Sequence, residues 1–285
     1  MITIFAPDGI GEVNPGADLA ELISDACAAA GRPLADGDLV CVTSKIISKA
    51  EDRAVPAERA AEAAAAESVA VVARRGGVRI VRNRQGITQA AAGIDSSNVE
   101  VGTILLLPQD PDASAAALLR ELGARTGLRL GVIITDTAGR AWRIGQTDHA
   151  IGLAGVRPTL DHAGLRDSYG NDLRVTEMAV ADELAAAADL AKGKLAGRPV
   201  AVIRGLAELI TDAEHSAREL QRPTEQDLFA RGSREAVLWA VLSAYRSTKR
   251  YAELVELDGE ELIKAVTEAV DGDPATVRAI VGTIA

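Results

Sequence analysis

The chain has 285 residues, 48% of them hydrophobic and 25% charged, which is the balance of a globular protein and excludes a disordered or fibrous chain. Its formal net charge of −10 argues against nonspecific binding to nucleic acid or to an anionic membrane, because both select clustered lysine and arginine. The sequence has no apolar run long enough to span a bilayer, and its N-terminus lacks the basic and apolar regions of a signal peptide, so we expect a cytoplasmic protein.

Helices and strands are mixed over residues 1–227 without a regular βαβ rhythm. Apolar residues at helical spacing predict helices at Asp18–Ala30, Ala57–Ala66, Ala113–Leu122 and Thr176–Leu190. Short apolar or alternating runs predict strands at Asp38–Val42, Leu130–Ile134, Pro199–Ile203 and Val78–Val81, the last forming a hairpin with the residues after Gly86. The predicted fold class is therefore α+β, with mixed sheets and packed helices.

The pattern changes after Leu228, where helices alone are predicted. They span Glu235–Tyr245, Asp258–Val270 and Ala275–Ile284, and their apolar faces must pack on something. A turn signal at Arg222-Pro223-Thr224 precedes them. We therefore predict one domain at residues 1–227 and a helical C-terminal extension at residues 228–285.

Several familiar sites are absent from the sequence. No Gly-x-x-x-x-Gly-Lys-Ser/Thr motif is present, which excludes a P-loop. His149, His162 and His215 lack the spacing of a metal site, and Cys27 and Cys41 have neither the number nor the spacing of a disulfide framework. Any anionic ligand must be held by other local groups.

The first candidate segment is Thr43–Glu51, where hydroxyl groups and two lysines follow a predicted buried strand. A turn of this kind can hold phosphates through backbone N–H groups and through the charges of Lys45 and Lys49. The alternative is a solvated strand end, which composition alone favours.

Two further segments each place an aspartate, Asp95 or Asp136, where an apolar run stops. Hard divalent ions such as Mg²⁺ prefer oxygen ligands, commonly one or two carboxylates together with substrate phosphates and water. Arg140 and Arg143 follow Asp136 and suit phosphate or carboxylate recognition, because a guanidinium group pairs with either through two hydrogen bonds. The alternative is that both aspartates cap turns or helices.

A fourth segment, Ala150–Gly155, is rich in glycine. Glycine in such a stretch indicates either a backbone conformation with positive φ or a close approach of chain or ligand. Both explanations stay open at the level of sequence.

Taken in this order, the segments resemble the coenzyme F420-0 gamma-glutamyl ligase family. The resemblance covers nearly everything from Ile4 to Gly205, and the ordered motifs together are far more specific than any one of them. It is carried by Val42–Lys45 and Ser48–Glu51, Ala92–Asn98, Val132–Thr137 with Gly139-Arg140, Trp142-Arg143 with Gly145, Ala150–Gly152 with Ala154-Gly155, Ala181–Leu184, Gly193-Lys194 and Arg204-Gly205.

The resemblance implies a GTP-dependent ligase that phosphorylates a carboxylate of coenzyme F420-0 and joins it to the amine of L-glutamate, with further gamma-linked glutamates added in later rounds. It also implies a divalent metal (Mg²⁺ or Mn²⁺), potassium and an intertwined homodimer of mixed α+β fold. Among the residues, it implies metal binding by Asp95, Asp136 and Thr137, and catalysis by Asp95, Asp136 and Arg140. The nucleotide-binding positions that it implies are Ile10, Gly11, Ser44, Lys45, Lys49, Asn98, Gly193 and Lys194.

The chain departs from this family at three places. Relatives commonly have Asn where Ala91 stands and an apolar residue where Lys192 stands. Some relatives continue into a flavin-binding domain, for which the 57 residues after Leu228 (285 minus 228) are too few.

Two other functions stay open. The first is a metal-dependent phosphatase or phosphotransferase that uses the same aspartates without glutamate. The second is a protein that binds a deazaflavin or nucleotide without turnover.

Overall fold

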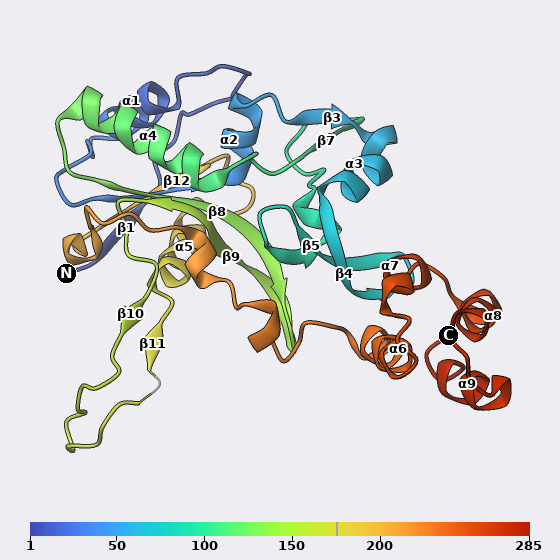
Figure 1. The fold of residues 1–285 in the computed structure, drawn as a ribbon. Helices are drawn as coiled ribbons and strands as arrows, with labels where there is room; N and C mark the ends of the chain where they lie inside the picture. Colours follow the sequence, from blue (N-terminus) through green and yellow to red (C-terminus); the bar gives the residue numbers. More distant parts are fainter. Residues whose placement is uncertain (175) are drawn as a thin grey trace. The chain divides into compact units, whose positions relative to one another are not determined.

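The computed structural model describes residues 1–174 and 176–285, which form two compact units. Unit 1 contains residues 1–63 and 93–221, and unit 2 contains residues 64–92 and 222–285. The α+β fold class predicted from the sequence is confirmed (Figure 1). The compact units do not coincide with a division at residue 227, because unit 2 also takes in a segment from the middle of the chain.

Unit 1 is built on a five-stranded sheet with the strand order β1-β12-β2-β8-β9 (Figure 1). Strands β2 and β8 pair in parallel and the other neighbours pair antiparallel. The central strands are almost wholly apolar, as expected of strands that are covered on both faces. The strands are β1 (Thr3–Phe5), β2 (Leu39–Thr43), β8 (Gly131–Arg140), β9 (Arg143–Ala154) and β12 (Val200–Arg204).

Helices cover the two faces of this sheet. Helices α1 (Leu19–Ala29) and α4 (Pro111–Thr126) lie on one face, and α5 (Val180–Lys192) lies on the other (Figure 1). Asp18 and Asp110 begin α1 and α4 by accepting hydrogen bonds from backbone N–H groups of the first turn. Inward-facing residues of the sheet form one buried cluster with α5: Leu39, Cys41, Ile133, Ala201, Ile203, Val180, Leu184 and Ala188.

Several short elements complete unit 1. Helix α2 (Ser44–Ala50) follows β2 directly, so the chain turns from strand to helix at Thr43. Strands β3 (Ala54–Pro56) and β7 (Thr103–Leu105) form a small sheet, and β10 (Leu160–Asp161) pairs with β11 (Glu177–Met178). No helix among the described residues is long and apolar enough to cross a membrane.

Two predicted boundaries in unit 1 are wrong. The strand predicted to end at Ile134 continues to Arg140 and returns as β9, because the residues past Ile134 pair with that strand, with register shifts after Ile134 and after Gly139 (Figure 1). The helix predicted from Thr176 begins at Val180, because Glu177–Met178 pairs with β10 instead. The other predicted helices and strands of this unit are confirmed, with ends shifted by a few residues.

The structure explains two glycines of the segment Ala150–Gly155. A Cβ atom on Gly152 would lie 2.4 Å from the carbonyl carbon of Pro111, so this glycine permits a close approach of β9 to α4. Gly155 combines a φ of +68° with a similar approach to Leu119. Both explanations that the sequence left open therefore apply, at different positions.

We expect Gly152→Ala to lower the melting temperature, because the added methyl group forces β9 and α4 apart at a cost of about 1–3 kcal/mol. Gly139→Ala is the matched control, since a Cβ atom there meets nothing within 4 Å in the same hairpin. Thermal unfolding of both variants measures the difference. Equal melting temperatures for the two variants would contradict the close approach.

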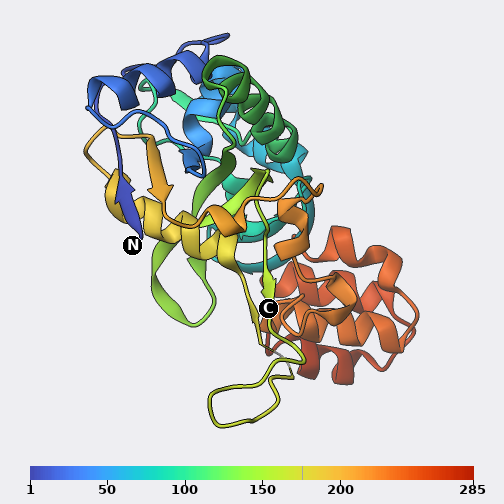
Figure 2. The same ribbon diagram turned by 90° about the vertical axis from the view of Figure 1, so that its left-hand side faces the viewer.

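Unit 2 combines a three-stranded antiparallel sheet with the C-terminal helices. The sheet contains β4 (Ser68–Arg75), β5 (Val78–Asn83) and β6 (Thr88–Ala90), and α3 (Ala60–Glu67) leads into it. The helices are α6 (Ser233–Ala244), α7 (Tyr251–Leu254), α8 (Gly259–Ala269) and α9 (Pro274–Val281), which confirms the predicted helical character of the tail (Figure 2).

The apolar faces of these helices share one core. Leu238, Leu242, Leu254 and Leu262 are fully buried in it. Val71 of β4 packs against the same core, and the N–H group of Gly232 donates to the carbonyl oxygen of Val72. The predicted extension is therefore half of a unit whose other half is the sheet β4-β5-β6.

Candidate active site

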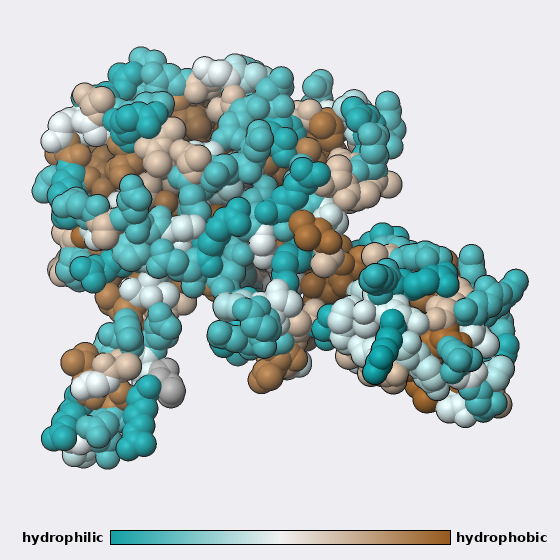
Figure 3. Space-filling view, viewed as in Figure 1, coloured by the Kyte–Doolittle hydropathy of each residue, from teal (hydrophilic) through white to brown (hydrophobic). Residues whose placement is uncertain are grey.

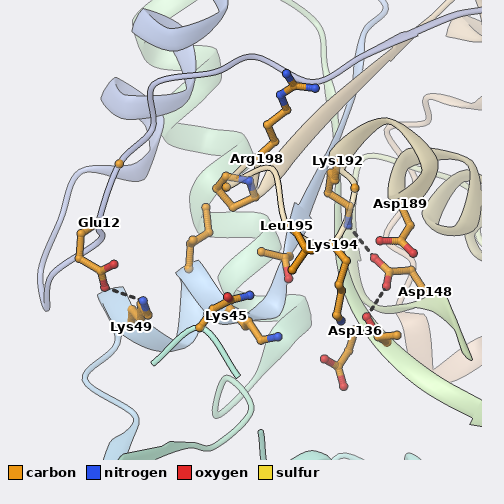
Figure 4. Close-up of a pocket in the computed structure, with 18 residues that line it drawn as sticks. Glu12, Lys45, Lys49, Asp136, Asp148, Asp189, Lys192, Lys194, Leu195 and Arg198 are labelled. Carbon is orange, nitrogen blue, oxygen red and sulfur yellow. Dashed lines mark hydrogen bonds and ion pairs between the residues drawn. The ribbon is translucent and has the colours of Figure 1, made fainter. Parts of the chain in front are cut away.

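Unit 1 contains a pocket of about 540 Å³ beside the end of β2, where the neighbouring strand β8 continues beyond it (Figure 4). Strand β2 stops at Thr43, opposite Thr135 of β8. Beyond this point the edge of β8 that faced β2 has no neighbouring strand, and α2 and the loop after α5 lie there instead. The pocket is lined by Gly11, Glu12, Thr43, Lys45, Ile46, Lys49, Asn98, Asp136, Thr137, Asp148, Asp189, Lys192, Gly193, Lys194, Leu195, Gly197, Arg198 and Pro199.

Most residues that the sequence nominated are brought together here. Those that line the pocket are Gly11, Lys45, Lys49, Asn98, Asp136, Thr137, Gly193 and Lys194. Ser44 and Asp95 touch lining residues, since the Ser44 hydroxyl donates to Asp136 at 3.0 Å and Asp95 pairs with Lys45. Ile10 is buried beside Gly11.

Arg140 is not brought to the pocket of its own chain. It is the last residue of β8, at the exposed end of the β8–β9 hairpin, where its Nη2 donates to the carbonyl oxygen of Ile144 at 3.4 Å. The sequence predicted a strand that ended at Ile134, whereas β8 continues to Arg140 and carries this residue to the end of the hairpin. The catalytic role of Arg140 stays a prediction.

Asp136 is half-buried and carries an unusual charge environment. Burial raises the pKa of its carboxyl to about 6, against the hydrogen bond from Ser44 that lowers it. The negative charges of Asp148 and Asp95 raise this pKa further, and Lys45 lowers it. A cation close to Asp136 would therefore stabilise the ionised form of its carboxyl group.

Asp95 belongs to the same charged cluster. Its Oδ2 lies 2.5 Å from Lys45 Nζ, and the Ser97 hydroxyl accepts a hydrogen bond from the same ammonium group at 2.8 Å. Burial works to raise the pKa of Asp95, but the bonds from Lys45 and Ser97 outweigh it and hold this pKa below its usual value. Asp95 and Asp136 are both half-buried, and the charge of Lys45 acts on both carboxylates. That they bind one metal ion stays a prediction.

The sequence analysis missed a buried ion pair in the pocket wall. Lys192 Nζ lies 2.6 Å from Asp148 Oδ2, and both residues are among the most buried charged residues of the described chain (Figure 4). Asp148 stands opposite Thr137 on β9. The sequence did not predict this register because the strand was expected to end at Ile134. Lys192 stands where relatives commonly have an apolar residue, and this departure could have indicated a buried partner.

Two further charged side chains at the pocket edge are also paired. Lys49 lies 2.5 Å from Glu12 (Figure 4), and Arg198 lies 2.6 Å from Asp8. These pairs are at least partly exposed, so each can exchange its partner for a ligand at little cost. The pocket edge thus offers cations to an anionic ligand.

The donor chemistry fits a hard divalent cation. The half-buried carboxylate of Asp136 and the residue Thr137 line the pocket, and the half-buried carboxylate of Asp95 pairs with Lys45, which also lines it. In the described residues no three Asp, Glu, His or Cys side chains group into a metal cluster. Mg²⁺ commonly takes one or two carboxylates and completes its shell with water and phosphate oxygens.

Carboxylates, lysines and a glycine-containing loop surround one pocket, and these groups suit a site that binds and positions charged reactants. The family model described as F420-0:Gamma-glutamyl ligase matches residues 9–205, and the chain belongs to this family. All predicted site residues from Ile10 to Lys194 fall inside this match.

Three relatives, each named Coenzyme F420:L-glutamate ligase, are similar over most of their length. The protein of Methanothermobacter thermautotrophicus is 38% identical over 248 residues, which cover 80% of this chain and 98% of the relative. That of Archaeoglobus fulgidus is 41% identical, with 81% and 97% covered, and that of Methanosarcina mazei is 39% identical, with 70% and 86% covered. The family resemblance that the sequence motifs indicated is confirmed.

Proposed function

We propose that the protein is a GTP-dependent ligase that adds L-glutamate to the carboxylate of coenzyme F420-0 and then extends the chain through gamma-linked glutamates. The observation that carries this proposal is the lysine-lined pocket that contains Asp136, with Asp95 paired to its Lys45. Family membership supplies the substrates, because the relatives are named for this cofactor and amino acid.

The groups suited to hold the phosphates of GTP are the lysines of α2 and the loop after α5. Lys45 and Lys49 lie one helical turn apart and both line the pocket. Gly193 has a φ of +63°, which lets the chain turn sharply at the end of α5 and places Lys194 at the pocket. Lys45 would leave Asp95, and Lys49 would leave Glu12, to meet phosphate oxygens.

Asp95, Asp136 and the hydroxyl group of Thr137 would hold the divalent metal, which would supply positive charge to phosphate oxygens during transfer. Ser44 keeps Asp136 in place through its hydrogen bond. This arrangement leaves Lys45 for the nucleotide, since the metal would replace it as the counter-charge of Asp95.

The proposed reaction has two steps. A carboxylate oxygen of F420-0 attacks the γ-phosphorus of GTP, the bond to the β,γ-bridging oxygen breaks, and GDP leaves. The amine of glutamate then attacks the acyl carbon, inorganic phosphate leaves with the bonding electron pair, and the amine gives up a proton as the amide forms. The pocket needs no serine or cysteine nucleophile, because its task is to position the reactants and balance charge.

We also propose that the protein is a homodimer. Trp142 and Ile144, at the end of the β8–β9 hairpin, are 82% and 102% exposed, and large apolar side chains on a projecting arm favour burial against another chain. Much of the molecular face seen in Figure 3 is hydrophilic. A catalytic role for Arg140 depends on this dimer, because the side chain lies outside the pocket of its own chain.

The test is incubation of the purified protein with GTP, L-glutamate, Mg²⁺ or Mn²⁺ and F420-0, followed by mass spectrometry. We expect products heavier by whole glutamate residues, GDP in proportion, and faster turnover with GTP than with ATP. Equal GTP consumption without glutamate would refute ligation and favour the phosphatase alternative. Binding of F420-0 without any turnover would favour the binding protein.

A further inference from the structure

The buried pair Asp148–Lys192 lies in the wall of the pocket beside the proposed metal ligands. The side chains of Asp148 and Lys192 are 3% and 5% exposed. Asp148 accepts hydrogen bonds from three groups: Lys192 Nζ at 2.6 Å, Thr135 Oγ1 at 2.8 Å and Thr137 Oγ1 at 2.7 Å. Lys192 Nζ also donates to Thr135 Oγ1 at 2.8 Å, so the three groups close a ring.

Stability alone does not explain this pair. Removing two charges from water costs several kcal/mol per ion, and well-packed apolar residues in place of such a pair are often neutral or stabilising. We therefore look for the role of this buried pair in the pocket that it lines and not in the stability of the fold.

The ring fixes the hydroxyl group of Thr137. A hydroxyl has one proton, and that of Thr137 is donated to Asp148, so the lone pairs of its oxygen remain for a cation in the pocket. Asp148 accepts this bond on Oδ1 while its Oδ2 accepts from Lys192 and Thr135, so the bonds to Oδ2 hold the carboxylate in this orientation. Its negative charge also lies close enough to Asp136 to act on it, and without compensation two neighbouring carboxylates would face one wall.

We propose that the Lys192 ammonium is a built-in monovalent cation of the active site. Two oxygen atoms, at 2.6 and 2.8 Å, hold it as they would hold a bound potassium or ammonium ion. It cancels the charge of Asp148 and so positions Thr137 for the divalent metal, which makes Lys192 a positioning residue. The role in catalysis rests on the proposed ligase function, whereas the cation role does not.

The first test is Lys192→Met, which removes the charge with an unbranched side chain that is one heavy atom shorter. The variant leaves Asp148 unpaired, so we expect its melting temperature to rise saturably with potassium or ammonium chloride and not with tetramethylammonium chloride at equal ionic strength. The melting temperature of the wild-type protein should not distinguish the three salts. Turnover of the wild-type enzyme should then need no added potassium, contrary to the expectation from the family resemblance.

The second readout is the affinity for Mn²⁺, measured by direct binding without substrates. We expect Lys192→Met to weaken Mn²⁺ binding by about tenfold in tetramethylammonium chloride, and ammonium to restore it. A purely structural lysine would not produce a cation-specific rescue. Both readouts stay informative if the ligase assay fails, because neither requires turnover.

Two control variants separate the explanations. Asp148→Asn combined with Lys192→Met removes both charges, so its melting temperature should not distinguish the salts. Lys264→Met breaks an exposed pair with Glu268 and should behave as the wild type does. A specific cation response in either control, or none in Lys192→Met, would overturn the proposal. If Lys192→Met does not fold in any salt, a folded double variant supports the proposal and an unfolded one overturns it.

Discussion

Replacing Asp136 by Asn is expected to abolish glutamate addition and, at pH 8, to make the folded protein more stable. The loss of activity should be at least about 10²–10³-fold, because this carboxylate is proposed to hold the metal that neutralises charge in the transition state. Asn can still accept the hydrogen bond from Ser44, so the local structure is kept. The loss of activity and the gain in stability have the same cause, which is the removal of the ionised carboxylate at this position.

The pH dependence has a definite sign. Burial raises the pKa of Asp136 from 3.8 to about 6, so the folded protein holds a proton there more tightly than the unfolded chain does. The stability that this group contributes is present below pH 3.8 and is lost as the pH rises through 6. Asn carries no such cost, and the gain at pH 8 should be about 1–3 kcal/mol.

Thermal unfolding of both proteins at pH 8 and pH 5, together with the mass-spectrometric assay, checks this prediction. The stability gain should shrink at pH 5. Asp25→Asn, on the exposed side of α1, serves as the control and should change neither activity nor the pH dependence. Retained ligation, or a variant that is less stable than the wild type at both pH values, would show that Asp136 has another role.

Truncation after Gln221 is expected to make the protein insoluble. The deletion removes all of the helices whose core Val71 packs against, so this face of the remaining sheet loses its cover. A three-stranded sheet without a partner for its apolar face is an aggregation hazard. The proposed catalytic residues all remain in the truncated chain, so a soluble remnant would retain its pocket.

The soluble fraction after expression and the light scattering of the purified protein measure this effect. Two point variants of the full chain give a graded comparison. Leu262→Ala, at a fully buried position, should cost about 2–5 kcal/mol, whereas Leu228→Ala, at a position 89% exposed, should leave the melting temperature unchanged. A monodisperse truncated protein would mean that unit 2 does not depend on its C-terminal half.

The sequence predicted elements best where local physics decides them. Helix α1 was predicted from its apolar spacing and from Asp18, which caps it in the structure. The predicted pocket residues came from ordered motifs, and Lys45, Lys49, Asp136 and Lys194 do lie together. Their nucleotide, metal and catalytic roles stay predictions.

The features that were missed depend on pairing between distant segments. Asp148 lines the pocket because it pairs opposite Thr137. Arg140 lies outside the pocket, at the end of a hairpin that is longer than predicted. Likewise, nothing local in Val71 indicates that it packs on helices that follow more than 150 residues later. Register and long-range packing are set by the whole fold, so periodicity alone does not determine them.

The division of unit 2 into residues 64–92 and 222–285 has a consequence for synthesis on the ribosome. The strands of its sheet emerge first, and the 129 residues at 93–221 follow before any of the helices that cover it. At ~5–20 residues per second, this interval lasts roughly 6–26 s. Unit 1 is complete at the end of the interval and can form its pocket then. The sheet β4-β5-β6 waits with its apolar face uncovered, which makes it the segment that a nascent-chain chaperone would protect.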